Sequence, residues 1–233
     1  MPAPTIHLVL MPGMDGTGEL FADFVSCLPH HLPATIIRYS DQPLGYADLL
    51  PLVKRAIPDD PFVIVAESFS TPLAIELAAT HPPNLKALVL CAGFATNPVP
   101  RLLRPIASRV TPRLTTLPLP KFAVRRWLTG STASPTLVAA VRAATASSTP
   151  QTRSSRLRHI FACDVRAELA RIVVPILCLQ PKDDKLIGPS GMEEIHSLKP
   201  SATVVHIDGP HLLLQRLPQQ TAAIIADFIH QLS

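Results

Sequence analysis

The chain has 233 residues, which is enough for one α/β domain with a sizeable core and an insertion. Hydrophobic residues make up 47% of it and charged residues 16%, a composition that excludes an intrinsically disordered protein. No apolar run reaches the roughly 18 residues that cross a bilayer, and the first residues lack the basic start and apolar stretch of a signal peptide. We therefore expect a cytoplasmic protein without an integral membrane segment.

The formal net charge of +4 conceals an uneven distribution of charge along the chain. Residues 77–163 contain no Asp or Glu, whereas the rest of the chain is net acidic. We expect the basic side chains to form a solvated face, and peripheral binding of an anionic lipid or of a CoA thioester is the alternative. Nucleic-acid binding is not expected, because few aromatic residues, chiefly Phe122 and Trp127, accompany the arginines and no recognition motif is present.

Short β-rich runs alternate with helical patterns along the chain, which is typical of βαβ units and a parallel sheet. Apolar residues recur at helical spacing over residues 20–28 and 49–57, residues 71–80 are helical by composition, and a final helix is expected over residues 219–231. Most of the strand candidates are continuously apolar, as expected for strands covered on both faces. The prediction is a doubly wound, mainly parallel six-stranded α/β sheet. The strand candidates are residues 6–11, 35–39, 62–66, 87–91, 176–180 and 203–207.

One region, residues 97–163, contains no convincing strand and consists of apolar and Arg-rich segments punctuated by proline. We predict that it forms a helical cap, with residues 1–96 and 164–233 as the core domain. Its apolar residues either roof a site at the edge of the sheet and set its specificity, or form the core of a small helical layer. These residues include Leu102, Leu103, Ile106, Leu114, Leu117, Phe122 and Trp127.

A glycine-rich turn follows the first strand candidate, in the run Leu10-Met11-Pro12-Gly13-Met14-Asp15-Gly16-Thr17-Gly18. A phosphate-binding loop is one interpretation, because three glycines lie close together before a helix. The spacing does not match G-x-G-x-x-G, however, and no G-K-[ST] follows. A nucleotide-binding role is therefore the weaker interpretation.

A serine lies where an apolar strand runs directly into a helix, in Phe62-Val63-Ile64-Val65-Ala66-Glu67-Ser68-Phe69-Ser70-Thr71-Pro72. A sharp turn at such a junction exposes the hydroxyl to a base and points the next backbone N–H at an oxyanion. Ala66 and Ser70 occupy the usual glycine positions of G-x-S-x-G, so the motif is a degenerate nucleophile elbow. The alternative is an ordinary N-cap serine, Ser68 or Ser70.

An acidic residue and a histidine follow the last two strand candidates, in Pro181-Lys182-Asp183-Asp184-Lys185-Leu186-Ile187 and Asp208-Gly209-Pro210-His211-Leu212. The chain order of serine, then aspartate, then histidine is that of the α/β-hydrolase triad. Because the carboxyl ends of parallel strands meet at one edge of a sheet, we expect these segments to lie close together.

The four segments resemble those of the α/β-hydrolase family, and the resemblance spans the chain apart from the details of residues 97–163. It implies that Ser68 is the nucleophile, His211 the general base and Asp184 the acid, with Asp183 as the reserve. The backbone N–H groups of Met14 and Phe69 would form the oxyanion hole, and we expect Gly13 and Trp127 to contact the substrate. Because the first strand candidate begins close to residue 5, we expect a sheet that lacks the first two of the family's usual eight strands.

The run from Met11 to Gly18, together with Glu67-Ser68-Phe69, is similar to a subgroup of esterases, lipases and acyltransferases. The resemblance implies a carboxylesterase-like serine hydrolase that cleaves a small-molecule acyl ester through an acyl-enzyme, without a metal or a cofactor. A thioesterase or acyltransferase with the same triad, or a low-turnover ligand-binding protein, is the alternative.

Overall fold

A computed structural model describes residues 6–100, 104, 110–117 and 119–232. Six parallel strands form one sheet in the order β2-β1-β3-β4-β5-β6, which confirms the predicted six-stranded parallel sheet. The second strand is shorter than the expected residues 35–39 and ends at Ile36. Beyond it, the backbone N–H of Tyr39 donates to the Gly16 carbonyl in the turn after β1 and does not continue the sheet. The strands are β1 (His7–Met11), β2 (Ala34–Ile36), β3 (Phe62–Glu67), β4 (Leu85–Cys91), β5 (Ile176–Pro181) and β6 (Thr203–Ile207).

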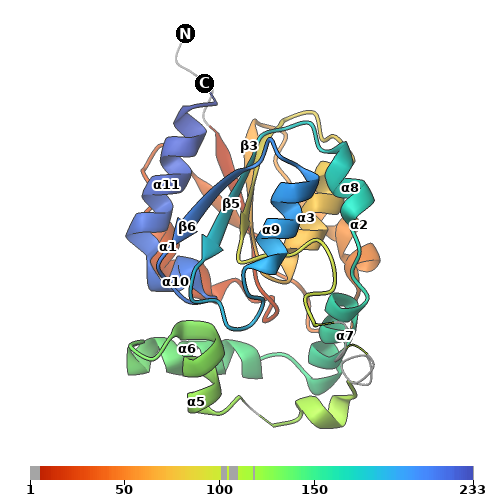
Figure 1. Cartoon of the computed structure of the whole chain (residues 1–233), viewed down its shortest axis with the longest axis vertical. Helices are drawn as coiled ribbons and strands as arrows, with labels where there is room; N and C mark the ends of the chain where they lie inside the picture. Colours follow the sequence, from red (N-terminus) through yellow and green to blue (C-terminus); the bar gives the residue numbers. More distant parts are fainter. Residues whose placement is uncertain (1–5, 101–103, 105–109, 118, 233) are drawn as a thin grey trace.

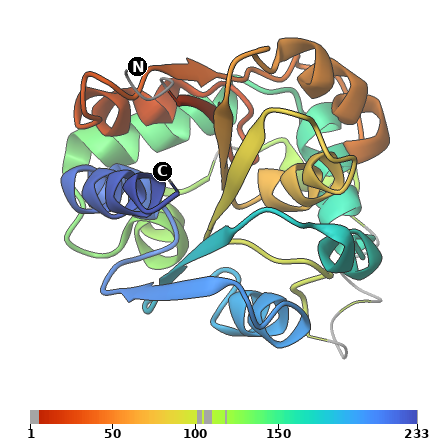
Figure 2. The ribbon, with the colours of Figure 1, turned by 90° about the horizontal axis from the view of Figure 1, so that it is seen from above.

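Helices cover both faces of the sheet (Figures 1 and 2). Alternate residues of β3 face opposite sides, with Val63 and Val65 in one apolar cluster and Phe62 and Ile64 in the other. This double burial explains why the strands are apolar without alternation. The first cluster lies under η1 (Glu19–Phe21), α1 (Ala22–Ser26), α10 (Leu213–Arg216) and α11 (Pro218–His230). The second lies under α2 (Tyr46–Ala56), α3 (Ser70–Ala78), α8 (Arg166–Arg171) and α9 (Ser190–Leu198).

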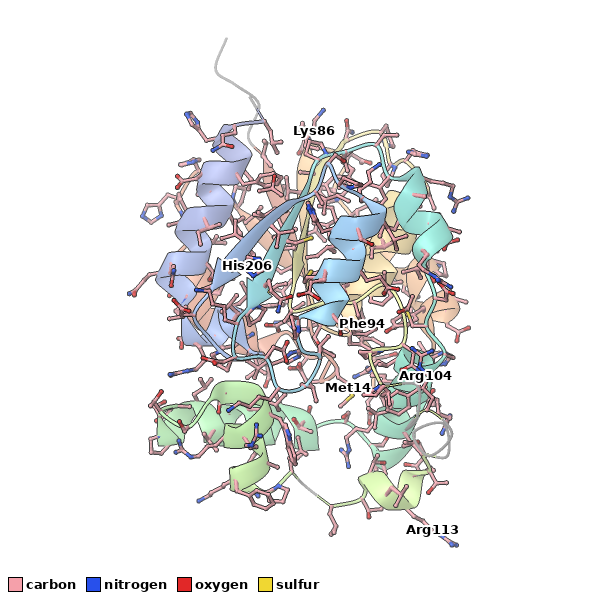
Figure 3. The ribbon with its side chains drawn as sticks, in the orientation of Figure 1. Met14, Lys86, Phe94, Arg104, Arg113 and His206 are labelled. Atoms are coloured by element: carbon pink, nitrogen blue, oxygen red, sulfur yellow. The ribbon has the colours of Figure 1, made fainter. Side chains whose placement is uncertain are left out.

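The described part of the insertion, residues 97–163, lies at the end of the sheet to which the strands point (Figure 1). Figure 3 shows this polarity, with Lys86 at one end of the molecule and Arg113 at the far tip of the insertion. A backbone bridge between Thr96 and Asp164 brings the two ends of the insertion together. Its elements are η3 (Pro112–Thr115), α5 (Lys121–Ala123), a π-helical turn η4 (Val124–Thr129), α6 (Pro135–Ala146) and α7 (Pro150–Phe161).

The residues at the start of the two longer helices of the insertion explain where these helices begin. Proline occupies the first position of both α6 and α7, where no backbone N–H is needed, and the preceding Ser134 and Thr149 side chains accept hydrogen bonds from the first turn. The small apolar core of the insertion contains Val138 and Val141 of α6 together with Leu212 from the core domain. The insertion therefore packs directly on the segment that carries His211.

The expectation for the apolar residues of the insertion is wrong at three positions. The exposed fractions of Leu114, Leu117 and Phe122 are 72%, 83% and 70%, so these side chains neither roof a site nor form a helical core. Their burial would need a second layer of protein, which the described residues do not provide there. The predicted residues Leu102, Leu103 and Ile106 lie outside the described residues.

Arginine side chains hold much of the insertion together by donating to backbone carbonyls. A guanidinium group carries five N–H donors. It can therefore bind several backbone carbonyls in loops and at helix ends, where these carbonyls have no partner in a helix or a strand. The expectation of a solvated face is wrong for Arg153 and Arg156, which are only 9% and 1% exposed. The donors among the described residues are Arg104, Arg125, Arg142, Arg153, Arg156 and Arg158.

In the part of the chain that the structure describes, no helix combines the length and apolar character of a membrane span.

Candidate active site

Ser68 occupies a strained turn between β3 and α3. Its φ angle is +49°, in the left-handed region that a residue with a side chain enters at a cost of about 1–3 kcal/mol. The backbone holds it there, because the Ser68 N–H donates to the Cys91 carbonyl at 2.9 Å. The Ser68 carbonyl accepts from the Thr71 N–H at 2.9 Å and from the Thr71 hydroxyl at 2.8 Å. The serine is therefore presented on a rigid elbow.

Ser70 occupies the position of the usual second glycine of the elbow, and its hydroxyl forms hydrogen bonds that a glycine could not form. The hydroxyl donates to the Pro12 carbonyl and lies 2.6 Å from the Tyr39 hydroxyl. It thereby ties the elbow to the turn after β1. The N-cap interpretation does not hold, because Phe69 occupies the cap position of α3 and no side chain caps that helix.

The structure brings Ser68, His211 and Asp184 together beneath the insertion. The Ser68 Oγ lies 2.9 Å from His211 Nε2, and His211 Nδ1 lies 2.8 Å from Asp184 Oδ2. All three residues are buried, with exposed fractions of 9%, 2% and 7%. A hydroxyl, an imidazole and a carboxylate in this order can pass a proton from serine to histidine.

Asp184 is held in place by its own loop. Its second carboxylate oxygen, Oδ1, accepts from the N–H groups of Leu186 and Ile187 at 2.8 and 2.9 Å. Burial alone would raise the pKa of Asp184, but the hydrogen bond and charge of His211 and these two N–H donors outweigh it and lower the pKa below its usual range. Asp183, the other candidate, is exposed. The geometry thus favours Asp184 as the partner of His211.

The turn after β1 lies beside the elbow and is closed by its own backbone. The Gly16 N–H donates to the Gly13 carbonyl at 3.1 Å, and Gly16 has a φ of +74°. Met14 lies at the end of the molecule that faces the insertion (Figure 3). Within the described residues, neither the Met14 N–H nor the Phe69 N–H donates to a protein acceptor. Two backbone N–H groups without a protein partner beside the serine suit an oxyanion.

A buried carboxyl group beside the serine is a feature that the sequence interpretation missed. Glu67 is 2% exposed, and its Oε2 accepts from Gln215 Nε2 at 3.1 Å. Burial raises the pKa of Glu67 to about 7, although the charge of His211 and the hydrogen bond from Gln215 partly oppose the shift. The signal was present in the sequence, because Glu67 is the one charged residue at the end of a fully apolar strand.

The two residues expected to contact the substrate lie in different surroundings. Gly13 is buried, and a Cβ atom added there would lie 3.7 Å from the Glu67 carboxyl group. Trp127 lies on η4 and is 43% exposed. The neighbouring Leu128 carbonyl accepts from the Leu212 N–H at 2.9 Å, so η4 contacts the His211 loop. None of the described contacts places the indole ring at Ser68.

A cavity of about 350 Å³ lies between η4 and the His211 loop, and Thr129, Gly130 and Pro210 contribute to its lining. This cavity is adjacent to the histidine segment rather than to the serine.

The described residues contain no group of three or more His, Cys, Asp or Glu side chains that could hold a metal ion.

The parallel sheet, the helical insertion at its carboxyl edge and the serine on a strand-to-helix turn define an α/β hydrolase. The chain belongs to the alpha/beta hydrolase family, whose model matches residues 4–224. No curated protein shows significant sequence similarity to it.

Solved structures of other enzymes share the fold over nearly the whole chain. The enol-lactonase from Burkholderia xenovorans LB400 is 19% identical with a TM-score of 0.79, covering 98% of this chain and 92% of its own. A thermophilic esterase from Thermogutta terrifontis is 18% identical with a TM-score of 0.79, covering 99% and 91%. MenH from S. aureus is 14% identical with a TM-score of 0.80, covering 99% and 95%. Identities this low show a common fold.

Proposed function

We propose that the protein is a carboxylesterase-like serine hydrolase that cleaves small acyl esters through an acyl-enzyme on Ser68. The observation that carries the proposal is the hydrogen-bonded chain in which His211 lies 2.9 Å from the Ser68 hydroxyl and 2.8 Å from Asp184. A free serine hydroxyl is a weak nucleophile, and an adjacent base of this kind activates it.

In the first half of the reaction, His211 Nε2 takes the hydroxyl proton while Ser68 Oγ bonds to the acyl carbonyl carbon. The carbonyl oxygen becomes an oxyanion, and the N–H groups of Met14 and Phe69 stabilise it, a contribution of about 3–4 kcal/mol for each donor in comparable sites. Collapse of the intermediate breaks the bond to the alcohol oxygen, which takes the proton from His211. The products of this half are the free alcohol and an acyl group on Ser68.

In the second half, a water molecule gives a proton to His211 and its oxygen attacks the acyl carbon. The bond to Ser68 Oγ breaks, the serine recovers its proton, and the carboxylic acid leaves. Asp184 holds the imidazole in the required tautomer and stabilises the imidazolium that forms twice in the cycle. The nucleophile, the base, the acid and the oxyanion donors in both halves belong to the chain, and water is the second reactant.

The fold supports ester chemistry without specifying the substrate. Similar structures include an esterase and an enol-lactonase, so the scaffold is used for such reactions in other proteins. Thioester cleavage and transfer to an alcohol would use the same side chains. A panel of acyl esters and thioesters of graded chain length therefore decides the substrate class.

Replacement of Ser68 by alanine tests the proposal. We expect the wild type to hydrolyse a short-chain p-nitrophenyl ester and Ser68→Ala to lower kcat by at least about 10⁴-fold, because the covalent step is lost. A fluorophosphonate probe should label the wild type and not the variant. Ser190→Ala, which changes an exposed serine, serves as the control and should retain full activity. Hydrolysis or labelling that persists in a folded Ser68→Ala protein would exclude Ser68 as the nucleophile.

A further inference from the structure

Arg156 lies on α7 of the insertion, yet its guanidinium group contacts the turn after β1 that carries Met14. It is 1% exposed, and among the described residues no carboxylate forms an ion pair with it. Asp15 and Asp41 act on its charge only at longer range. A buried cation that no carboxylate contacts directly is costly unless hydrogen bonds replace its hydration. The contacts of this one group therefore point to what it does.

The guanidinium donates to two carbonyls of the turn that carries Met14. Its Nη1 lies 2.8 Å from the Met14 carbonyl oxygen and 2.9 Å from the Asp15 carbonyl oxygen. Its Nη2 donates to the Ser40 carbonyl at 3.1 Å. The Gly16 N–H holds the preceding peptide through the Gly13 carbonyl. The Asp15 carbonyl shares a planar peptide unit with the Gly16 N–H, and the Gly13 carbonyl shares one with the Met14 N–H. By holding the Asp15 carbonyl, Arg156 therefore orients the Gly16 N–H, whose bond to the Gly13 carbonyl sets the direction of the Met14 N–H.

The turn has a matching space for this group. A Cβ atom at Gly16 would lie 2.7 Å from Arg156 Nη1, so the guanidinium fills the position that any side chain at residue 16 would need. The glycine-rich run after β1 thus contains a residue that admits the arginine. This gives a structural reason for a glycine that does not belong to a phosphate-binding pattern.

Arg156 also reaches the second proposed oxyanion donor. Its guanidinium carbon lies 5.9 Å from the centre of the Phe69 ring and 5.8 Å from that of Tyr39. A cation over an aromatic face is attracted to it, more strongly when both are buried. One side chain from the insertion therefore packs against the residues that supply both N–H groups.

The helix that carries Arg156 is anchored to the core domain along its length. The Thr149 N–H donates to Asp41 at 2.8 Å, and the Ser155 hydroxyl donates to the Pro43 carbonyl at 2.9 Å. His159 lies 6.1 Å from the Tyr46 ring, centre to centre. These contacts hold α7 on the segment between β2 and α2, so the guanidinium has a defined position.

We propose that Arg156 is a positioning residue for acyl transfer: from the insertion it holds the Met14–Gly16 turn so that the Met14 N–H points at the developing oxyanion. This inference rests on the proposed function. It assigns the insertion a part in the chemical step, in addition to any role in substrate binding. A residue of this kind should affect kcat more than KM, because the oxyanion exists only after attack on the carbonyl.

Arg153 provides a matched control on the same helix. It is also buried and donates to the backbone carbonyls of Thr115, Thr145 and Ser148, all within the insertion. Arg153→Ala thus removes the same number of charges and comparable hydrogen bonds without touching the turn. Any effect that is only structural should appear in both variants.

Kinetics on a p-nitrophenyl ester test the inference. We expect Arg156→Ala to lower kcat about 10–100-fold, below the 10²–10³-fold loss of a whole oxyanion donor, while KM changes less than about 3-fold. Arg156→Lys should retain an intermediate kcat, since an ammonium group reaches fewer carbonyls. Guanidinium chloride at about 50 mM, far below denaturing concentrations, should partly restore Arg156→Ala but not change Arg153→Ala. Equal kcat values for the two alanine variants would overturn the inference.

Two further measurements keep the test decisive if Arg156→Ala folds poorly or if the proposed function fails. Gly16→Ala should displace the guanidinium, lower kcat to a similar extent, and show no added loss when combined with Arg156→Lys. Hydrogen exchange of peptides covering residues 13–18 needs no turnover and should speed up about 10-fold in Arg156→Lys and not in Arg153→Ala. If Ser68→Ala keeps wild-type activity, the proposed function is wrong, whereas the contact between Arg156 and the turn can still be tested by exchange. If exchange in this turn is unchanged, the role of Arg156 is wrong whatever the activity.

Discussion

At the scale of single residues, Glu67 links the site to the pH dependence of stability. In the folded protein its pKa is about 7, mainly because it is buried beside Ser68, whereas an exposed glutamate has a pKa near 4.5. Between these values the folded state keeps a proton that the unfolded state has lost. Stability contributed by the neutral carboxyl is therefore present below about pH 4.5 and is lost as the pH rises to about 7.

Glu67→Gln should remove this dependence, because the amide stays neutral and can still accept from Gln215. Relative to wild type, we expect the free energy of unfolding of the variant to increase between pH 4.5 and 7 and to gain at most about 3 kcal/mol above pH 7. Urea unfolding at pH 5, 6, 7 and 8 measures the difference. Glu19→Gln, which changes an exposed carboxyl, is the control. Parallel curves for Glu67→Gln and wild type would contradict the expectation.

At the scale of elements, the loop after β5 selects between two adjacent aspartates. Asp184 turns inward and accepts from the Leu186 and Ile187 N–H groups, while Asp183 is exposed and its backbone N–H donates to the Gly209 carbonyl. The loop therefore presents one carboxylate to His211 and uses the other residue to join the aspartate and histidine segments.

The two asparagine variants should differ sharply in activity. We expect Asp184→Asn to lower kcat about 10³–10⁴-fold, because the amide no longer favours the required tautomer of His211; an equivalent change in serine proteases costs about 10⁴-fold. Asp183→Asn should remain within about 3-fold of wild type. Steady-state kinetics on the same ester compares them, with circular dichroism to verify folding. Equal losses would mean that the acid acts through the loop and not through one carboxylate.

At the scale of the whole molecule, the insertion and the core domain share their contacts. Helix α7 bonds to the segment after β2, and Leu212, next to His211, belongs to the apolar core of the insertion. A Cβ atom at Gly130 would lie 3.5 Å from Pro210, at a second point of contact with the histidine loop. Figure 1 shows the insertion across the end of the sheet to which the strands point. Such shared packing favours cooperative unfolding.

Trp127, the single tryptophan of the chain, reports on the insertion, whereas circular dichroism reports mostly on the core domain. Because the two parts share a core, we expect denaturant curves followed by tryptophan fluorescence and by circular dichroism to coincide, with equal midpoints and slopes. Phe122→Trp should give the same midpoint from a second position in the insertion. Fluorescence changes that precede the loss of circular dichroism would show that the insertion unfolds separately.

The sequence alone was sufficient for the sheet and for the segments at its edge. The length and composition of the apolar runs specify strands buried on both faces, and turn residues after them place Ser68, Asp184 and His211 in loops at the carboxyl edge. These are local properties of the chain, and the parallel order of the strands makes the loops converge. The bounds of the insertion at residues 97 and 163 and the roles of the site residues stay predictions.

Only the tertiary structure decided which buried polar group meets which partner. Arg156 and the Met14 carbonyl are 142 residues apart, and Gln215 and Glu67 are 148 apart. The sequence pattern of the insertion suggested a solvated basic face and buried leucines, yet Arg156 is buried while Leu117 is exposed. A guanidinium can satisfy any nearby set of carbonyls. Its partners therefore depend on how α7 packs against the core domain, which no local pattern encodes.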